Sequence, residues 1–134
     1  MIKDSFKSLA VLVVDDDNIS RKIAVSVLNT LGVNNIVLAK NGAEALETLA
    51  KASQSFDLVV TDIEMPEMDG FELARKIRLG AVEKFKSIPI LMLTGHNTDE
   101  YIRKGRIHRV QGFIVKPPST ETLARHIKRA LKIK

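Results

Sequence analysis

Acidic residues, a threonine and a lysine stand directly after short apolar runs in this chain of 134 residues. Asp15 and Asp16 follow the first run, and Asp62 ends the third. Thr94 ends the fourth run, and Lys116 follows the fifth. Clustered carboxylates repel one another unless a cation neutralises them, and hard oxygen ligands of this kind favour Mg²⁺. Because a lysine and a threonine can hold phosphoryl oxygens, the set predicts Mg²⁺-dependent phosphoryl chemistry.

The apolar runs are predicted to be strands of one parallel sheet. They occupy residues 9–14, 35–39, 57–61, 89–94 and 112–115. Three of them are almost continuous and rich in β-branched residues, as is typical of strands buried on both faces. Amphipathic stretches between them predict helices, so the alternation indicates a doubly wound α/β fold. Ligands bind beyond the carboxyl ends of the strands in such folds, which would bring the polar residues together at one edge.

Local signals predict where the helices begin and which sides they bury. The expected N-caps are Asn18, Asn41, Asp69 and Ser119. An apolar stripe on the first helix is expected to face the core, and it consists of Ile19, Ile23, Val27, Leu28 and Leu31. The segment around Tyr101 has few large apolar residues, and Gly105 lies in its middle. A helical glycine costs about 1 kcal/mol relative to alanine, so we expect this fourth helix to be mobile or irregular.

Length and composition favour a single domain over residues 1–134, with its core at about 9–132. The chain has no cysteine, which excludes a disulfide scaffold and a thiolate metal site. It also contains no apolar stretch near the roughly 20 residues that a membrane span needs. We therefore expect a cytoplasmic protein with no membrane partner.

Charge is distributed unevenly along the chain. Residues 101–134 carry ten lysines and arginines against one acid, Glu121, whereas residues 1–100 carry 11 against 15 acids. Such a basic end favours an acidic protein or a polyanion as partner, although a solvated face that aids solubility explains it equally well. Nucleic-acid binding has little support, because aromatic residues make up only 4% of the chain and no reading motif is present.

The chain resembles the receiver domain of two-component response regulators, and most of all the single-domain chemotaxis type. The resemblance extends from residue 11 to about residue 131. Its motifs are Val13-Val14-Asp15-Asp16-Asp17, the segment 62–70 (DIEMPEMDG), Leu93-Thr94-Gly95 and Val115-Lys116-Pro117. The resemblance implies a flavodoxin-like fold, in which five helices flank a five-stranded sheet of order 2-1-3-4-5. It also implies a cis bond between Lys116 and Pro117.

The resemblance assigns roles to the polar residues at the sheet edge. Asp62 would be the phosphoacceptor, and a sensor histidine kinase or histidine phosphotransfer protein would donate the phosphoryl group. Mg²⁺ would be ligated by Asp16, Asp62 and the backbone carbonyl of Glu64, with Asp15 helping through water. Thr94 and Lys116 would hold the phosphoryl oxygens. The protein would not be an enzyme in the usual sense, although it would assist its own phosphorylation and dephosphorylation.

Further residues are expected to control the switch and its output. Thr94 and Phe113 would change position on phosphorylation, although Phe113 also reads as a plain core residue. Glu64 and His96 would set the lifetime of the phosphorylated state, although His96 also reads as a solvated loop residue. An unknown downstream protein would bind a basic face, which is defined by Arg103, Arg106, Arg109 and Lys128.

Other readings of the same residues remain open at this stage. Each motif alone could be an ordinary turn, cap or loop, and only the combination at the strand ends is specific. A small Mg²⁺-dependent phosphatase would need a second acid for general catalysis, which Asp15 or Glu64 could supply. The chain could also be a receiver module of a larger hybrid kinase or regulator.

Overall fold

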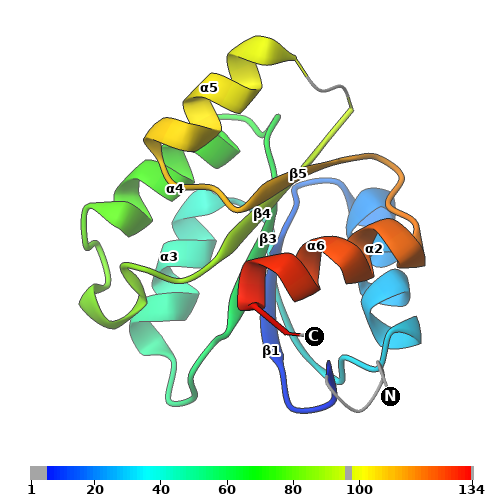
Figure 1. Cartoon of the computed structure of the whole chain (residues 1–134). Coiled ribbons are helices and arrows are strands. Elements are labelled where there is room, and N and C mark those ends of the chain that lie inside the picture. The colour runs from blue at the N-terminus through cyan, green and yellow to red at the C-terminus, as the bar shows by residue number, and fades with distance from the viewer. Residues whose placement is uncertain (1–5, 96–97, 134) are drawn as a thin grey trace.

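Strands and helices alternate along the chain in the computed structural model, which describes residues 6–95 and 98–133 (Figure 1). The strands are β1 (Ala10–Val14), β2 (Asn35–Ala39), β3 (Leu58–Asp62), β4 (Ile90–Thr94) and β5 (Gly112–Val115). The helices are α2 (Asn18–Thr30), α3 (Gly42–Lys51), α4 (Gly70–Arg78), α5 (Asp99–Ile107) and α6 (Thr120–Leu131), with a 3-10 turn at Glu83–Phe85. None of the described helices is long and apolar enough to cross a membrane.

The strands form one parallel sheet of order β2-β1-β3-β4-β5. This order confirms the predicted doubly wound topology, and the strand bounds agree with the predicted runs within one residue. Because the three central strands are buried along their whole length, apolar residues fill successive positions and not alternate ones, and the polar exceptions, Thr61, Asp62 and Thr94, stand near the carboxyl ends.

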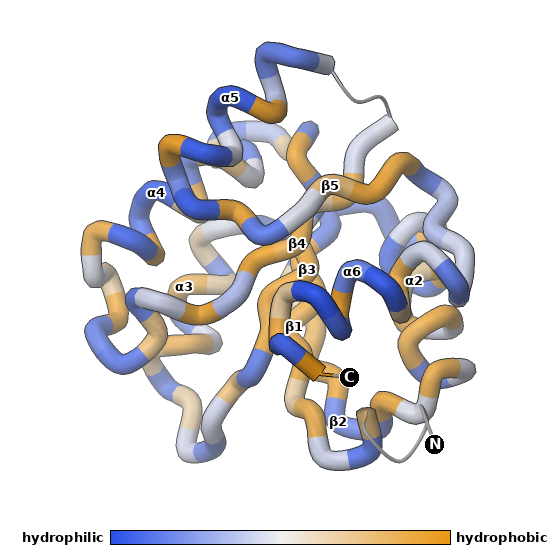
Figure 2. The backbone as a smooth tube through the Cα atoms, in the orientation of Figure 1, coloured by the Kyte–Doolittle hydropathy of each residue, from blue (hydrophilic) through white to orange (hydrophobic). Residues whose placement is uncertain are grey.

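Helices cover both faces of the sheet, with α2 and α6 on one face and α3, α4 and α5 on the other (Figure 1). Successive side chains along a strand point to opposite faces of the sheet. Leu12 packs in the cluster beneath α3 and α4, whereas Val13 packs in the cluster beneath α2 and α6. Apolar residues accordingly concentrate in the strands, while the outer sides of the helices are polar (Figure 2). Phe6, which precedes the predicted core, is also fully buried.

Three of the four predicted N-caps are confirmed. The side chains of Asn41, Asp69 and Ser119 each accept a hydrogen bond from the backbone N–H three residues later, at 2.8, 2.8 and 3.1 Å. The prediction of Asn18 is wrong by one position. Asp17 caps α2 and accepts from the Ser20 N–H at 2.7 Å, so Asn18 is already the first helical residue.

The predicted apolar stripe of α2 is only partly correct. Ala24 and Leu28 are the buried residues of the helix, and Leu31 follows them into the core. Ile19 and Ile23 are 72% and 39% exposed, so the prediction that they face the core is wrong. The sheet contacts the second half of the helix, and a small residue, Ala24, sits where helix and sheet approach each other.

The helix α5 is regular, which corrects the expectation of an irregular fourth helix. Thr98 caps it by accepting from the Tyr101 N–H at 3.2 Å. Gly105 is buried under the ring of Phe113, and a Cβ atom at Gly105 would lie 2.4 Å from the Cζ atom of Phe113. The glycine therefore makes room for an aromatic ring of β5, and this packing offsets its poor helix propensity.

Sequence reasoning did not single out Arg78, which is 7% exposed at the end of α4. Its guanidinium donates to the carbonyl oxygens of Lys86, His108 and Arg109, at 3.0 Å each. Burial, with the positive charge of Arg109 adding to it, lowers the pKa of Arg78 to about 10. The guanidinium remains charged at neutral pH and ties α4 to the segment that joins α5 to β5.

Replacing Gly105 by alanine is expected to lower the free energy of unfolding by about 1–3 kcal/mol, because the new methyl group would overlap the Phe113 ring. Propensity alone predicts a gain of about 1 kcal/mol, so the sign separates the two effects. Urea unfolding followed by circular dichroism measures the change. Arg103→Ala, at an exposed position of the same helix, is the control and should be nearly neutral. If Gly105→Ala proves more stable than the parent chain, the Phe113 ring can move aside without a cost in free energy.

Candidate functional site

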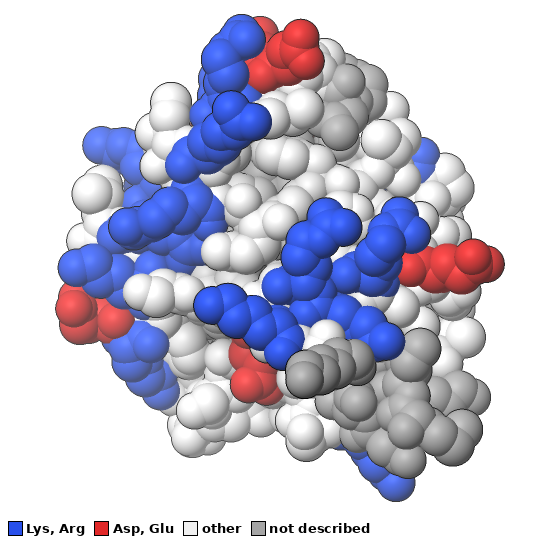
Figure 3. Space-filling model, in the orientation of Figure 1, with Lys and Arg blue, Asp and Glu red and all other residues white. Residues whose placement is uncertain are grey.

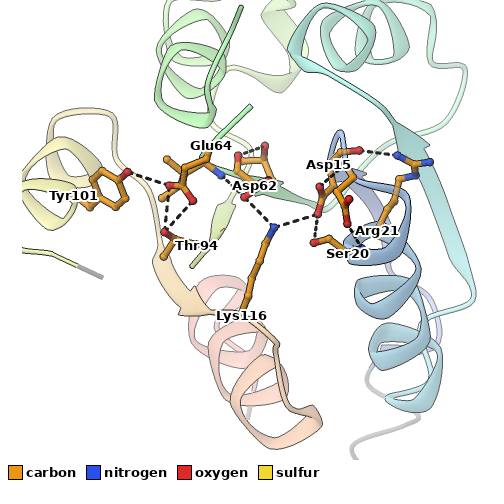
Figure 4. A network of polar contacts seen from close by, with 11 residues as sticks. Asp15, Ser20, Arg21, Asp62, Glu64, Thr94, Tyr101 and Lys116 are labelled. Carbon is orange, nitrogen blue, oxygen red and sulfur yellow. Dashed lines mark hydrogen bonds and ion pairs between the residues drawn. The ribbon is translucent and has the colours of Figure 1, made fainter. Parts of the chain in front are cut away.

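The predicted site residues meet at the carboxyl edge of the sheet (Figure 4). Asp62 is the last residue of β3 and Thr94 the last residue of β4. Asp15 follows β1, and Lys116 follows β5. Four strands thus bring these side chains together, because the ends of neighbouring parallel strands lie side by side.

Three carboxylates form a compact acidic cluster at this edge. One carboxylate oxygen from each of Asp15, Asp16 and Asp62 lies within 4.8 Å of the others. Asp15 and Asp62 are 1% and 5% exposed, whereas Asp16 is exposed. Two buried carboxylates and one that faces solvent make a set of hard oxygen ligands that is open on one side. Such a set suits a small divalent cation that keeps several waters.

Lys116 bridges the two buried carboxylates. Its Nζ atom lies 3.1 Å from Oδ1 of Asp62 and 3.5 Å from Oδ2 of Asp15. Burial by itself lowers the pKa of Lys116, but the hydrogen bond and the negative charge of Asp62 outweigh it and leave the pKa raised. The ammonium group is therefore fixed as a cation beside Asp62. The peptide bond between Lys116 and Pro117 is cis, as the resemblance implied.

Asp15 is held by donors from the start of α2, which sequence reasoning missed. Ser20 Oγ donates to Oδ2 of Asp15 at 2.5 Å, and the backbone N–H of Asp17 donates to Oδ1 at 3.0 Å. Arg21 Nη1 donates to the backbone carbonyl of Asp15 at 2.8 Å. The sequence contained a signal for these contacts, because Ser20 and Arg21 lie in the first turn of the helix that follows Asp15. Both oxygens of Asp15 are thus engaged by the protein.

Asp62 is the most perturbed carboxyl group of the site. Its Oδ1 atom accepts from the Ile63 N–H at 2.9 Å as well as from Lys116. Burial raises the pKa of Asp62 to about 6, with the charges of Asp15 and Glu64 adding to the effect and Lys116 opposing it. The carboxylate is therefore ionised at neutral pH, but in an environment that disfavours its charge.

Gly70 fixes the loop that follows Asp62. Its N–H donates to the carbonyl of Ile63 at 2.9 Å. A Cβ atom at Gly70 would lie 2.5 Å from the backbone oxygen of Asp62, so a larger residue would push the loop away from the strand end. Glu67, in the same loop, has a φ of 69°, which marks a tight turn. The loop between β3 and α4 is therefore packed closely against the backbone of Asp62.

The Thr94 hydroxyl contacts the carboxylate of Glu64 (Figure 4). Its Oγ1 atom lies 3.4 and 3.3 Å from the two carboxylate oxygens of Glu64. Tyr101, from the first turn of α5, donates to Oε2 of Glu64 at 3.0 Å. That hydrogen bond is the largest cause of the raised pKa of Tyr101. Sequence reasoning treated Tyr101 only as an apolar residue of a weak helix and missed this role of its hydroxyl group.

Phe113 is half-buried between two other elements. Its ring covers Gly105 of α5, and its centroid lies 6.2 Å from that of Phe71 in α4. Phe71 in turn packs edge-on against Tyr101, with ring centroids 5.3 Å apart. An aromatic cluster of Phe71, Tyr101 and Phe113 therefore joins β5, α4 and α5. His96, the second residue expected to set the phosphorylated lifetime, lies outside the described residues.

Fold and site together define a flavodoxin-like α/β domain with an acidic cluster at the carboxyl edge of its sheet. The family model described as response regulator receiver domain matches residues 11–128, and the chain belongs to this family. Members of the family are phosphoacceptor switches of two-component signalling and are not enzymes in the usual sense.

Individual relatives agree with this assignment. The chain is 41% identical over 117 residues to the chemotaxis protein CheY-3 of Vibrio cholerae, and this match covers 87% of each of the two chains. The solved structure of CheY4 of Vibrio cholerae is 35% identical and has a TM-score of 0.81, over 92% of this chain and 100% of that one. The receiver domain of the histidine kinase CKI1 from Arabidopsis thaliana, solved with Mg²⁺ and BeF₃⁻, is 31% identical with a TM-score of 0.80. That match covers 99% of this chain and 95% of the other.

Replacing Asp62 by asparagine is expected to raise the free energy of unfolding at pH 7.5, without divalent cations, by about 1–3 kcal/mol. In the folded chain the pKa of Asp62 is about 6, whereas the ordinary pKa of an aspartate is 3.8. Native stability therefore falls as the pH rises from about 4 to 6, and the cost of ionising Asp62 is complete above that range. An asparagine side chain does not ionise, so the variant is free of this cost at every pH.

Urea unfolding at pH 7.5 and pH 4 measures the effect, and the difference between variant and parent should shrink towards zero at pH 4. Glu47→Gln, at an exposed position of α3, is the matched control and should change little at either pH. A loss of stability in Asp62→Asn at pH 7.5 would mean that the Lys116 ion pair outweighs desolvation.

Proposed function

We propose that Asp62 is the phosphoacceptor of this receiver. The supporting observation is the position of its buried carboxylate at the end of a central strand, between the Lys116 ammonium and the other carboxylates. One oxygen of Asp62 attacks the phosphorus of a phosphohistidine on a sensor histidine kinase or phosphotransfer protein. A bond from the carboxylate oxygen to phosphorus forms, the bond from phosphorus to the imidazole nitrogen breaks, and histidine leaves. Water later attacks the acyl phosphate and releases inorganic phosphate.

The donor set fits Mg²⁺ as the resident cation. Carboxylate oxygens of three aspartates lie within 4.8 Å of one another, and among the described residues Lys116 alone forms ion pairs with them, so the carboxylates outnumber their ion-pair partner. Asp16, Asp62 and the backbone carbonyl of Glu64 are the proposed direct ligands. Because the protein already engages both oxygens of Asp15, this residue acts through water. When bound, the metal offsets negative charge on the phosphoryl oxygens.

The remaining side chains position and stabilise the phosphoryl group. Lys116, 3.1 Å from Asp62, is placed to hold one phosphoryl oxygen and to offset the developing charge. After leaving Glu64, the Thr94 hydroxyl donates a hydrogen bond to another phosphoryl oxygen. Phe113 follows this movement, and Glu64 and His96 set how fast water removes the phosphoryl group. The chain thereby assists its own phosphorylation and dephosphorylation.

Output takes place through the basic face on α5 and α6. Lysines and arginines gather over these two helices in Figure 3, and Arg103, Arg106 and Arg109 are exposed. Together with Lys128 they present positive charge with few acids nearby, which favours an acidic partner protein. The switch acts by changing the position of α5 and hence the arrangement of this face.

Incubation with Mg²⁺ and acetyl phosphate is expected to add one phosphoryl group to the intact chain, as measured by mass spectrometry. The gain should vanish without Mg²⁺ and in Asp62→Asn, because the nucleophile and the charge compensation are then missing. Asp99→Asn preserves the site, changes the net charge equally, and should still gain the group. A folded Asp62→Asn variant that gains the same mass would place the acceptor elsewhere.

Neutralising two arginines of the basic face is expected to weaken binding of a labelled polyglutamate peptide about two- to thirtyfold, from about 0.2–1 kcal/mol for each exposed ion pair. The variant Arg103→Ala/Arg106→Ala is compared with Lys22→Ala/Lys51→Ala, which removes the same charge from α2 and α3. Fluorescence anisotropy at low and at physiological salt measures affinity. Equal losses in the two variants would indicate attraction by overall charge and no defined face.

A further inference from the structure

Glu64 joins two parts of the molecule that the switch has to coordinate. Its carboxylate accepts hydrogen bonds from Thr94, at the end of β4, and from Tyr101, in the first turn of α5 (Figure 4). Thr94 is fully buried, whereas Tyr101 is half-buried. The carboxylate therefore stands between the phosphoryl site and the helix that carries part of the basic face.

The two hydrogen bonds of Glu64 differ in strength. The hydroxyl of Tyr101 donates to one oxygen at 3.0 Å, whereas the hydroxyl of Thr94 is shared between both oxygens at 3.3 and 3.4 Å. Longer, divided hydrogen bonds are weaker. Tyr101 thus holds the carboxylate, and the held carboxylate holds Thr94 by a contact that is readily exchanged.

A threonine hydroxyl carries one proton and can make one full donation at a time. Thr94 cannot donate fully to Glu64 and to a phosphoryl oxygen on Asp62 together. We infer that Tyr101 is a positioning residue, which keeps Glu64 against Thr94 and so opposes the phosphorylated arrangement. This inference rests on the proposed function, because it takes Thr94 as a ligand of the phosphoryl group.

Ring packing fixes the direction in which the Tyr101 hydroxyl points. The Tyr101 ring meets the buried Phe71 ring edge-on, at 5.3 Å and an interplanar angle of 64°. Four residues further along α5, and so on the same side of the helix, Gly105 receives the ring of Phe113. The helix is thus held at one point by a hydrogen bond to the site and at another by the aromatic residue of β5.

Phosphorylation acts on this arrangement from the site. A phosphoryl group draws Thr94 away from Glu64 and adds about −1.5 to −2 charge close to a carboxylate that is already negative. Repulsion then moves Glu64 away, and the hydrogen bond from Tyr101 to Glu64 breaks. The first turn of α5 is released from the site, and the arginines further along that helix are free to change position.

Calorimetric titration with beryllofluoride in excess Mg²⁺ tests the inference, because this anion stands in for the phosphoryl group on a carboxylate. Tyr101→Phe removes one oxygen atom and retains the ring on Phe71. It is expected to bind beryllofluoride about three- to tenfold more tightly than the parent chain, since one opposing hydrogen bond is missing. In a Glu64→Ala background the same change is expected to alter affinity less than twofold.

The four affinities separate the possible failures. No binding by the parent chain would contradict the proposed function itself. Binding by the parent with an unchanged or weaker affinity in Tyr101→Phe would overturn the inference alone. An equal gain with and without Glu64 would also overturn it, because a purely structural effect of Tyr101 does not depend on that carboxylate.

Tyrosine emission provides a second test in the unaltered protein. The chain contains one tyrosine and no tryptophan, so its emission reports on Tyr101 alone. A phenol bonded to a carboxylate emits weakly, and loss of the Glu64 acceptor is expected to raise the emission as beryllofluoride binds. The Glu64→Ala variant should emit strongly from the start and change little. Saturation of the parent chain without a change in emission would show that Tyr101 keeps its partner, against the inference.

Discussion

Repulsion between carboxylates at one edge of the sheet sets the conditions for the rest of this site. Asp15 and Asp62 are buried there, and Lys116 is the cation that stands between them. The protein adds neutral donors, from Ser20 and from the backbone of Asp17, but these do not remove the excess negative charge. Burial is the main cause of the raised pKa of Asp62, and the negative charges of Asp15 and Glu64 add to it. A site built in this way is stabilised by gaining a cation, and the Asp62 carboxylate is ionised but poorly solvated, which suits its proposed role as the nucleophile.

The positions of the site residues were predictable because these residues stand at strand ends. A parallel sheet brings the carboxyl ends of its strands together whatever the loops do, so the residues that end the apolar runs identify the edge of the site. Asp62 and Thr94 needed no knowledge of tertiary packing for this reason. Helix caps such as Asn41 and Asp69 were predictable for a similar reason, since their hydrogen-bond partners lie three residues away.

The features that sequence reasoning missed depend on partners far along the chain. The Tyr101 hydroxyl meets Glu64 across 37 residues, and Arg78 reaches the carbonyl of Arg109 across 31. No local pattern distinguishes such a tyrosine from one that only packs. Gly105 misled in the opposite direction, because its local propensity argues against a helix while the ring above it requires the absence of a side chain. Ile19 shows the same limit, since an apolar period identifies a stripe but not how much of it the sheet covers.

The two sides of the sheet hold their helices differently, and this difference gives the switch a direction. The cluster beneath α2 and α6 is almost entirely aliphatic, so moving these helices would expose apolar surface. On the other side, α4 buries six of its nine residues, whereas α5 buries only Gly105. Little apolar burial opposes a movement of α5, and its position depends on aromatic contacts and on the bond from Tyr101 to Glu64. The bond to Glu64 contributes about 1 kcal/mol at the start of α5, whereas the end of the helix is tied to α4 by the hydrogen bonds from Arg78 to His108 and Arg109. Under the proposed function, charge added at Asp62 acts close to the bond from Tyr101 to Glu64, so the first turn of α5 is the part of the helix expected to respond to it.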